Sequence, residues 1–391
     1  MDIQPDKDPR IDSGNDDHLV GESNRDSDDL KEKGNQRKEG ATTEQSRTAV
    51  ENDGAAELAR NLEDKVTLIM ATSPVKSNPS TVLLKHTMDS IRVYCKGTYK
   101  LRKIIVCDGY STTEEKNQKG VARKGRRIAE DKVADYKEYI RRVQELIEQK
   151  EDPAFHKAET LVLPKLHGFG LAMKEALKLV KTPYVFVAQH DRCFSTKATG
   201  LDTLVQLLEK EPLVRYVGYL THRQLNYASR MMSQHQLKVN PVRKQGVLLA
   251  PLIHFLDSMH VARVSFWKYM FETGTIKVRS FPEHTFGNVQ RWDIVKNGWK
   301  AFEKYGTYLL WDANVCVKHI NGRTFLDTVQ RQRRGFPALG PFAELEDKLK
   351  EHDKLSRSVM HTEGGKGEMP KDKETHQTSN EDNGTVMDDE R

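Results

Sequence analysis

The sequence predicts an α/β fold in which helices cover both faces of a doubly wound, mostly parallel sheet. Two observations lead to this prediction. Short apolar runs rich in β-branched residues alternate along the chain with longer segments whose apolar residues recur at helical spacing. Polar residues follow several of the apolar runs, where a parallel sheet would present them at one edge. Alternation of buried strands and helices is typical of a parallel sheet covered on both sides.

The predicted elements follow one another in a regular order up to about residue 210. A first strand over 66–71 ends in a loop of Thr, Ser, Pro and Asn, after which Ser80 is expected to cap a helix over 81–95. A long charged segment over 126–150 carries one apolar stripe and is predicted to be a helix. The other elements predicted in this half are strands over 103–107, 160–163 and 184–188 and helices over 170–180 and 199–208.

The pattern is less regular after residue 215. Short apolar runs there mix with helical stretches, and no internal repeat is visible. We expect this half to extend the same sheet and to build the second wall of a binding site. Its predicted strands cover 216–220, 247–249 and 308–311, and its predicted helices cover 264–271 and 288–297.

Charge divides the 391 residues into a basic body and two acidic ends. Residues 1–62 have a net charge of −7 and residues 361–391 one of −5, which leaves +18 for the residues between them. The acidic ends cannot bury enough apolar surface to offset the entropy lost on ordering, so we expect them to be disordered. The predicted organisation is a disordered segment over 1–62, a folded body over 63–335, a helical extension over 336–360 and a disordered tail over 361–391.

Several classes of protein are disfavoured by what the sequence lacks. No apolar run approaches the ~20 residues that span a membrane, and no basic segment followed by an apolar one opens the chain. The four cysteines lie far apart without CxxC spacing, which argues against a disulfide framework and against a zinc knuckle. We therefore predict a cytoplasmic protein with no transmembrane segment.

Polar side chains stand at the predicted carboxyl ends of three strands. Parallel strands bring these ends to one edge of the sheet, and ligands of such sheets bind just outside that edge. We therefore expect these side chains to line one binding site. The residues concerned are Thr72, Ser73, Pro74, Asp108, Gln189, His190, Asp191 and Arg192.

The segment over 161–194 resembles the central part of GT-A glycosyltransferases, above all the enzymes similar to family 2. Ala172, Leu177 and Tyr184 stand at the spacing of the family pattern, and Asp191 falls where an acidic metal-binding motif ends a strand. Further matching positions are the loop after the first strand, Asp108, His319 and Arg323, so that the resemblance covers roughly 65–325. The sequence departs from the pattern at Lys174, which replaces an asparagine, and at Gln189-His190-Asp191, where the acidic pair is reduced to one carboxylate.

The resemblance implies an enzyme that moves a sugar from a nucleotide-sugar donor to an unknown acceptor hydroxyl, with inversion at the sugar. It also implies that residues 63–200 form the nucleotide-binding half and residues 201–335 the acceptor half. It implies a divalent cation, Mn²⁺ or Mg²⁺, at the donor diphosphate, with Asp191 and His319 as ligands. Asp191 and Glu283 are the implied catalytic residues, and Glu283 is the candidate base for the acceptor hydroxyl. The implied donor-binding residues are Thr72, Ser73, Pro74, Asp108, Lys174, Gln189, His190, Arg192 and Arg323.

Other interpretations of these residues stay open. Residues 190–192 can form a local ion pair at the end of a strand, and Glu283 can be a carboxylate favoured by the start of a helix. Arg192, Lys174 and Arg323 can neutralise a diphosphate without any metal.

Three functions other than glycosyl transfer are possible for such a sequence. The basic run over 116–127 could bind nucleic acid. The sequence has no segment in which aromatic and basic residues alternate, and no zinc-finger spacing, so nucleic acid is disfavoured as a partner. A nucleotidyltransferase can share such a sheet, but the loop after the first strand contains Lys76 and no glycine. A non-catalytic relative stays open because one acidic residue of the metal motif is missing.

Overall fold

The computed structural model describes residues 62–112, 128–278, 280–311 and 315–335. The predicted acidic ends, apart from Leu62, the predicted extension over 336–360 and the basic run over 116–127 lie outside the described residues. The described residues of both predicted halves of the body contribute to one sheet.

The main sheet of the described residues has nine strands in the order β3-β2-β1-β4-β9-β6-β10-β8-β7. The strands are β1 (Val66–Thr72), β2 (Arg102–Cys107), β3 (Ala158–Val162), β4 (Tyr184–Gln189), β6 (Tyr216–Gly218), β7 (Val242–Lys244), β8 (Val247–Pro251), β9 (His260–Arg263) and β10 (Thr307–Leu310). Strands β3, β2, β1 and β4 pair in parallel, and β9 and β8 run against the other strands. The predicted α/β class with a mostly parallel sheet is confirmed.

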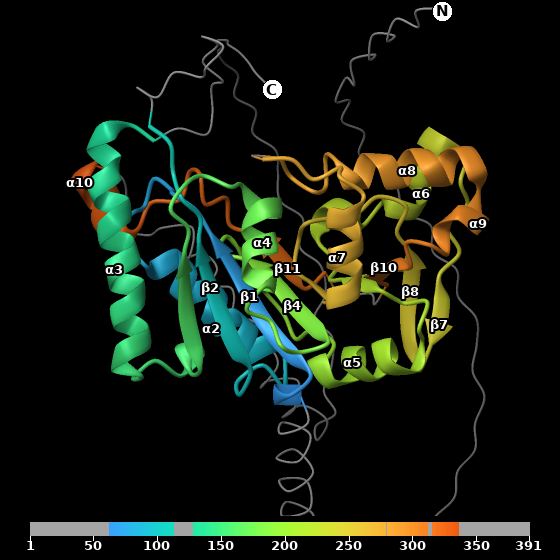
Figure 1. The fold of residues 1–391 in the computed structure, drawn as a ribbon, viewed down its shortest axis with the longest axis horizontal. Helices are drawn as coiled ribbons and strands as arrows, with labels where there is room; N and C mark the ends of the chain where they lie inside the picture. Colours follow the sequence, from blue (N-terminus) through green and yellow to red (C-terminus); the bar gives the residue numbers. More distant parts are fainter. Residues whose placement is uncertain (1–61, 113–127, 279, 312–314, 336–391) are drawn as a thin grey trace, which may run out of the picture. The chain divides into compact units, whose positions relative to one another are not determined.

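The helices cover both faces of this sheet (Figure 1). Helix α2 (Val82–Tyr94) connects β1 to β2, whereas α4 (Phe169–Leu177) returns the chain from β3 across β2 and β1 to β4. Because parallel crossovers are right-handed, connections that run in opposite directions along a sheet lie on opposite faces. The other α-helices are α3 (Val133–Gln149), α5 (Leu201–Lys210), α6 (Tyr227–His235), α7 (Val264–Glu272), α8 (Phe286–Asn297), α9 (Trp299–Phe302) and α10 (Thr328–Arg333).

Burial explains why these segments form these elements. Every residue of β1 is buried, as expected of a strand with helices on both faces. Helix α2 buries Leu84, Met88 and Ile91, which recur at helical spacing, and leaves its charged residues at the surface. Around Phe255 an aromatic cluster joins β9, α7 and α8, so the second half of the chain shares the same core.

A two-stranded sheet of β5 (Arg192–Phe194) and β11 (Val317–His319) extends the structure beyond the end of β4. The strands are antiparallel, and the register places His319 opposite Arg192. Because β5 begins three residues after the last residue of β4, this register carries His319 to the carboxyl end of β4.

Most predicted elements agree with the structure to within a few residues, and the differences have local causes. The helix predicted from residue 126 begins only at Val133, after a 3-10 turn over Glu130–Lys132. The predicted cap at Ser80 is wrong by one residue: Thr81 holds the N-cap position without a side-chain cap. Strand β9 was not predicted. No helix among the described residues combines the length and the apolar character needed to cross a membrane.

Candidate functional site

The strand order reverses direction between β1 and β4, and the predicted polar residues gather at that point. Strand β2 lies on one side of β1 and β4 on the other, so the connections leaving β1 and β4 diverge. The Asp108 backbone N–H donates to the Thr72 carbonyl at 3.0 Å, and Gln189 pairs in register with Ala71. The carboxyl ends of β1, β2 and β4 therefore meet at one edge, where doubly wound sheets bind their ligands.

Asp191 and His319 are predicted site residues whose side chains are in contact. His319 Nε2 lies 3.1 Å from Asp191 Oδ2, and the Gly322 backbone N–H donates to the same oxygen at 3.3 Å. Although burial opposes ionisation, the hydrogen bond from His319 and the nearby charges hold the pKa of the Asp191 carboxyl below its usual range. Asp191 is therefore an anion at neutral pH.

The other carboxylate oxygen, Asp191 Oδ1, is buried and accepts no hydrogen bond from any described residue. A free carboxylate oxygen beside an imidazole suits a divalent cation, and Mn²⁺ accepts such a mixed set more readily than Mg²⁺. The described residues contain no group of three or more His, Cys, Asp and Glu side chains that could hold a metal. Asp191 Oδ1 therefore suits a cation that also takes ligands from a bound phosphate, and His319, whose Nε2 faces Asp191 Oδ2, has its Nδ1 lone pair to add to that set.

Asp108 uses both of its carboxylate oxygens inside the protein. Oδ1 accepts from the His167 backbone N–H at 2.9 Å, and Oδ2 accepts from the Gly168 backbone N–H at 2.8 Å. Burial raises the pKa of this carboxyl, and the two backbone donors oppose that shift. Asp108 thus fixes the loop that leads into α4, and these contacts compete with its predicted role in donor binding.

Glu283 lies in the turn before α8 and forms a carboxyl pair with Asp257. The two side chains are hydrogen-bonded, and Asp257 is only 6% exposed. Burial, then the charge of Glu283, raise the pKa of Asp257 far above its usual range. Asp257 therefore keeps a proton at neutral pH and donates it in the hydrogen bond to Glu283.

This carboxyl pair is tied to the end of β4. Gln189 Nε2 donates to the Asp257 carbonyl at 2.7 Å. The Arg192 guanidinium lies close enough to lower the pKa of both Asp191 and Asp257. Arg192 is therefore a cation shared by the Asp191–His319 pair and the Asp257–Glu283 pair.

The start of α4 connects Asp108 to the turn that carries Glu283. A Cβ added at Gly170 would lie 2.6 Å from Ile276 Cγ2 and 3.1 Å from Pro282 Cγ. Only a residue without a side chain allows α4 to approach that turn so closely. The start of α4 therefore contacts both the sheet edge that holds Asp108 and the turn that holds Glu283.

The remaining predicted residues have more varied surroundings. The Thr72 hydroxyl donates to the Val106 carbonyl at 3.2 Å, and His190 Nδ1 lies 3.2 Å from the Ala71 carbonyl. Lys174 faces α7, with its Nζ 5.8 Å from the centre of the Phe271 ring. Ser73 and Pro74 are half-buried in the loop after β1, and Arg323 is exposed beside Gly322.

Sequence reasoning missed Asp257 and Gly322. Asp257 follows an apolar run with no motif around it, and its partner Glu283 lies 26 residues further along the chain, so no local pattern marks the pair. Gly322 lies three residues after His319 and directly before Arg323, and these two predicted site residues were the signals that could have led to it.

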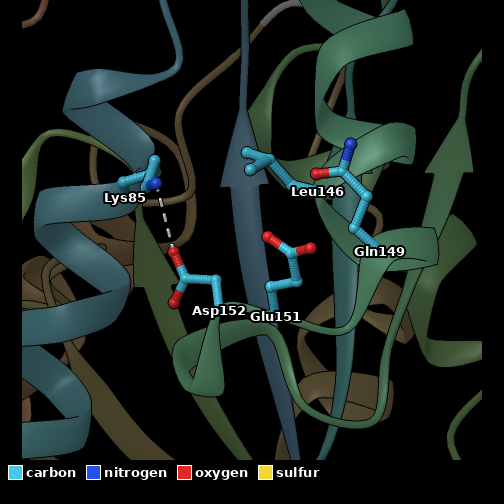
Figure 2. Close-up of a pocket in the computed structure, with 5 residues that line it drawn as sticks. All are labelled: Lys85, Leu146, Gln149, Glu151 and Asp152. Atoms are coloured by element: carbon cyan, nitrogen blue, oxygen red, sulfur yellow. Dashed lines mark ion pairs between the residues drawn. The ribbon is translucent and has the colours of Figure 1, made fainter.

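A hollow of about 370 Å³ lies elsewhere, at the end of α3 (Figure 2). It is lined by Leu146, Gln149, Glu151, Asp152 and Lys85 of α2, and an ion pair of 3.3 Å joins Lys85 to Asp152. It contains none of the predicted site residues. It is therefore a surface feature between two helices and is separate from the candidate site.

Comparisons with protein-family models and with curated proteins find no match. Among solved structures, TarS 1-349 of S. aureus is 12% identical, with 65% of this chain and 59% of that chain covered and a TM-score of 0.36. Mannosyltransferase PcManGT from Pyrobaculum calidifontis, solved with GDP-Man and Mn²⁺, is 13% identical, with 78% of each chain covered and a TM-score of 0.38. A cytidylyltransferase from Leptospira borgpetersenii is 11% identical, with 76% of this chain and 97% of that chain covered and a TM-score of 0.35. The chain thus spans about three fifths of TarS 1-349.

Proposed function

We propose that this protein is a glycosyltransferase that moves a sugar from a nucleotide-sugar donor to an acceptor hydroxyl, with inversion at the sugar. The observation that carries the proposal is the Asp191–His319 pair at the carboxyl end of β4, where the strand order reverses. The segment over 161–194 that resembles family 2 enzymes contains Asp191 of this pair. The proposal therefore joins a sequence pattern to a location that sheets of this type use for binding.

The donor diphosphate would lie beside Asp191 and His319. Together with phosphate oxygens, these two side chains would hold a divalent cation, which supplies positive charge next to the leaving diphosphate. Arg192, within electrostatic reach of Asp191, adds a second positive charge on the protein side. Arg323 is exposed next to Gly322, where its guanidinium is free to reach a phosphate.

The acceptor hydroxyl would approach Glu283, which acts as the general base. The proton of Asp257 occupies one side of Glu283 in a hydrogen bond, which orients the carboxylate and leaves the lone pairs on its other side for the acceptor. Asp257 is thus a positioning residue. Glu283 is half-buried, so a substrate can reach it.

Calorimetry of the full chain with UDP and with GDP, with and without Mn²⁺, tests the donor site. We expect binding that weakens at least tenfold on removal of Mn²⁺, in Asp191→Asn and in His319→Ala, because each change removes the cation beside the diphosphate or one of its ligands. Asp89→Asn and His222→Ala change the same residue types on α2 and before α6, and they should bind like the unaltered protein. Binding that is equally strong in all variants would contradict the proposed donor site.

A second measurement separates catalysis from binding. Release of nucleotide diphosphate from UDP- and GDP-sugars, with water as a slow acceptor, should fall by roughly 10²-fold or more in Glu283→Gln, the range expected for loss of a general base. Nucleotide binding by the same variant should stay unchanged. Binding without any release, in the unaltered protein and with every donor, would instead identify a non-catalytic relative.

A further inference from the structure

A group of basic side chains surrounds the turn that carries Glu283. We call Arg230, His235, His254 and Arg291 the acceptor-side cluster; its members come from α6, from the loop after β8 and from α8. All four side chains are half-buried. None of them belongs to the donor site at the end of β4.

Two helix contacts bring the cluster together. The Tyr227 hydroxyl of α6 accepts from the Ile253 backbone N–H at 2.8 Å, and a Cβ at Gly287 of α8 would lie 3.1 Å from His254 Nε2. Arg230 follows Tyr227 by three residues and Arg291 follows Gly287 by four, so each arginine lies on the face of its helix that meets this loop. Helices α6 and α8 lie at the same end of the sheet in Figure 1.

The cluster contains polar nitrogen atoms that the described residues leave unpaired. His235 Nε2, His254 Nδ1 and Arg291 Nε are buried and have no hydrogen-bond partner among those residues. Neither Arg230 nor Arg291 forms an ion pair within the described part of the chain. Arg230 donates to the Arg223 carbonyl at 3.3 Å, and the Arg291 guanidinium lies 5.4 Å from the centre of the exposed Trp292 ring. Buried polar atoms without partners mark positions where a water or an ion completes the hydrogen bonding.

The charge around Glu283 is positive at neutral pH. Arg230 and Arg291 each carry a full positive charge, whereas burial lowers the pKa of His254 to about 4 and keeps its ring neutral. Asp257 holds its proton, so the Asp257–Glu283 pair carries one negative charge between its two members. An additional anion would therefore be attracted to this place.

We infer that the acceptor-side cluster binds a phosphate group of the acceptor and thereby presents the acceptor hydroxyl to Glu283. This inference rests on the proposed function. Guanidinium groups bind phosphate through paired hydrogen bonds, and His254 lies within electrostatic reach of both Arg230 and Arg291, so side chains from three elements can contact one tetrahedral anion. The cluster is held on two helices packed on one loop, so it is positioned before the acceptor arrives.

Calorimetric titration of the full chain with inorganic phosphate, at constant ionic strength and with UDP and Mn²⁺ saturating, tests the inference. We expect a site that prefers phosphate to acetate and that weakens about tenfold in Arg230→Gln and in Arg291→Gln. Lys296→Gln on the exposed face of α8 is the matched control, and it should bind phosphate like the unaltered protein. Equal binding in both arginine variants, or equal weakening in all three variants, would overturn the inference.

The nucleotide titration keeps this inference separate from the proposed donor site. Arg291→Gln should bind UDP and GDP normally, whereas Asp191→Asn should lose nucleotide binding and keep phosphate binding. Loss of nucleotide binding in Arg291→Gln would mean that the cluster serves the donor and would overturn its assignment to the acceptor. Arg291→Lys, which keeps the charge, guards against a folding defect, and it should restore part of the phosphate affinity.

Two further probes identify where such a phosphate comes from. Glycerol 1-phosphate represents a soluble acceptor, and phosphatidylcholine vesicles with and without phosphatidylglycerol represent a lipid-borne one. Binding of either probe that depends on Arg291 supports the inference and identifies the source. If neither probe binds in an Arg291-dependent way, the inference is wrong for an acceptor phosphate.

Discussion

Replacing Asp257 with asparagine tests whether Asp257 and Glu283 share a proton in the folded protein. Asparagine has nearly the same shape and can still donate a hydrogen bond to Glu283, but it has no proton to release. The change therefore leaves the geometry of the pair in place and removes only its titration. The free energy of unfolding should become less dependent on pH, and this pH dependence is the quantity to measure.

The magnitude follows from the raised pKa of Asp257. In the unfolded chain this carboxyl titrates near its ordinary value of about 3.9, whereas in the folded chain burial and the charge of Glu283 keep it protonated past neutral pH. A carboxyl whose folded pKa is raised stabilises the fold fully below its unfolded pKa, and this contribution is lost as the pH rises toward the folded pKa. The loss is about 1.4 kcal/mol for each pH unit, or about 3 kcal/mol between roughly pH 5 and pH 7.

Urea unfolding followed by tryptophan fluorescence at several pH values measures this effect. The difference in unfolding free energy between Asp257→Asn and the unaltered protein should shift in favour of the variant as the pH rises. Glu283→Gln removes the charge that disfavours ionisation of Asp257, so it should reduce the same pH dependence. Glu272→Gln, an exposed carboxylate on α7, is the control and should leave it unchanged. A difference between Asp257→Asn and the unaltered protein that stays constant with pH would refute the shared proton.

Two other changes test the donor site and the core. In Gly322→Ala the new Cβ would lie 3.1 Å from Asp191 Cβ and 3.2 Å from its Oδ2, so we expect the carboxylate to move. Calorimetry should then find the affinity for nucleotide diphosphates lowered roughly tenfold. An unchanged affinity would contradict this geometry. His260 is fully buried against Tyr216, and burial lowers its pKa to about 4. The neutral ring therefore stabilises the fold above its unfolded pKa of about 6.5, and about 3 kcal/mol of the unfolding free energy is lost as the pH falls toward 4. Urea unfolding of His260→Phe should show a smaller loss over the same range, and an identical loss would place the acid sensitivity elsewhere.

The sequence by itself determined most of the first half of the fold. The run over 66–71 became β1 because an apolar, β-branched segment is stable only when both of its faces are buried. Helix α2 was predicted to within one residue at each end because its buried residues repeat at helical spacing. These signals are local, so they can be read without knowing what the segment packs against.

Elements that depend on distant partners were not predictable in this way. Strand β9 is four residues long and pairs antiparallel with β4 and β6, so it joins the two halves of the sheet. Its position depends on hydrogen bonds to strands more than 40 residues away, and the sequence of a four-residue segment does not indicate which strands it will pair with. The order of the sheet beyond β4 was therefore decided by tertiary pairing.

The candidate site, too, was predictable from the sequence only in part. Its location followed from the sequence, because polar residues after apolar strands must gather at one edge of a parallel sheet. The contact of Asp191 with His319 depends on the register of β5 and β11, and the hydrogen bond of Asp257 with Glu283 depends on how the turn before α8 meets the loop after β8. The sequence thus determined which polar side chains lie at this edge of the sheet. Only the tertiary structure decided which side chains share protons and charges there, because burial and proximity across long stretches of chain set those interactions.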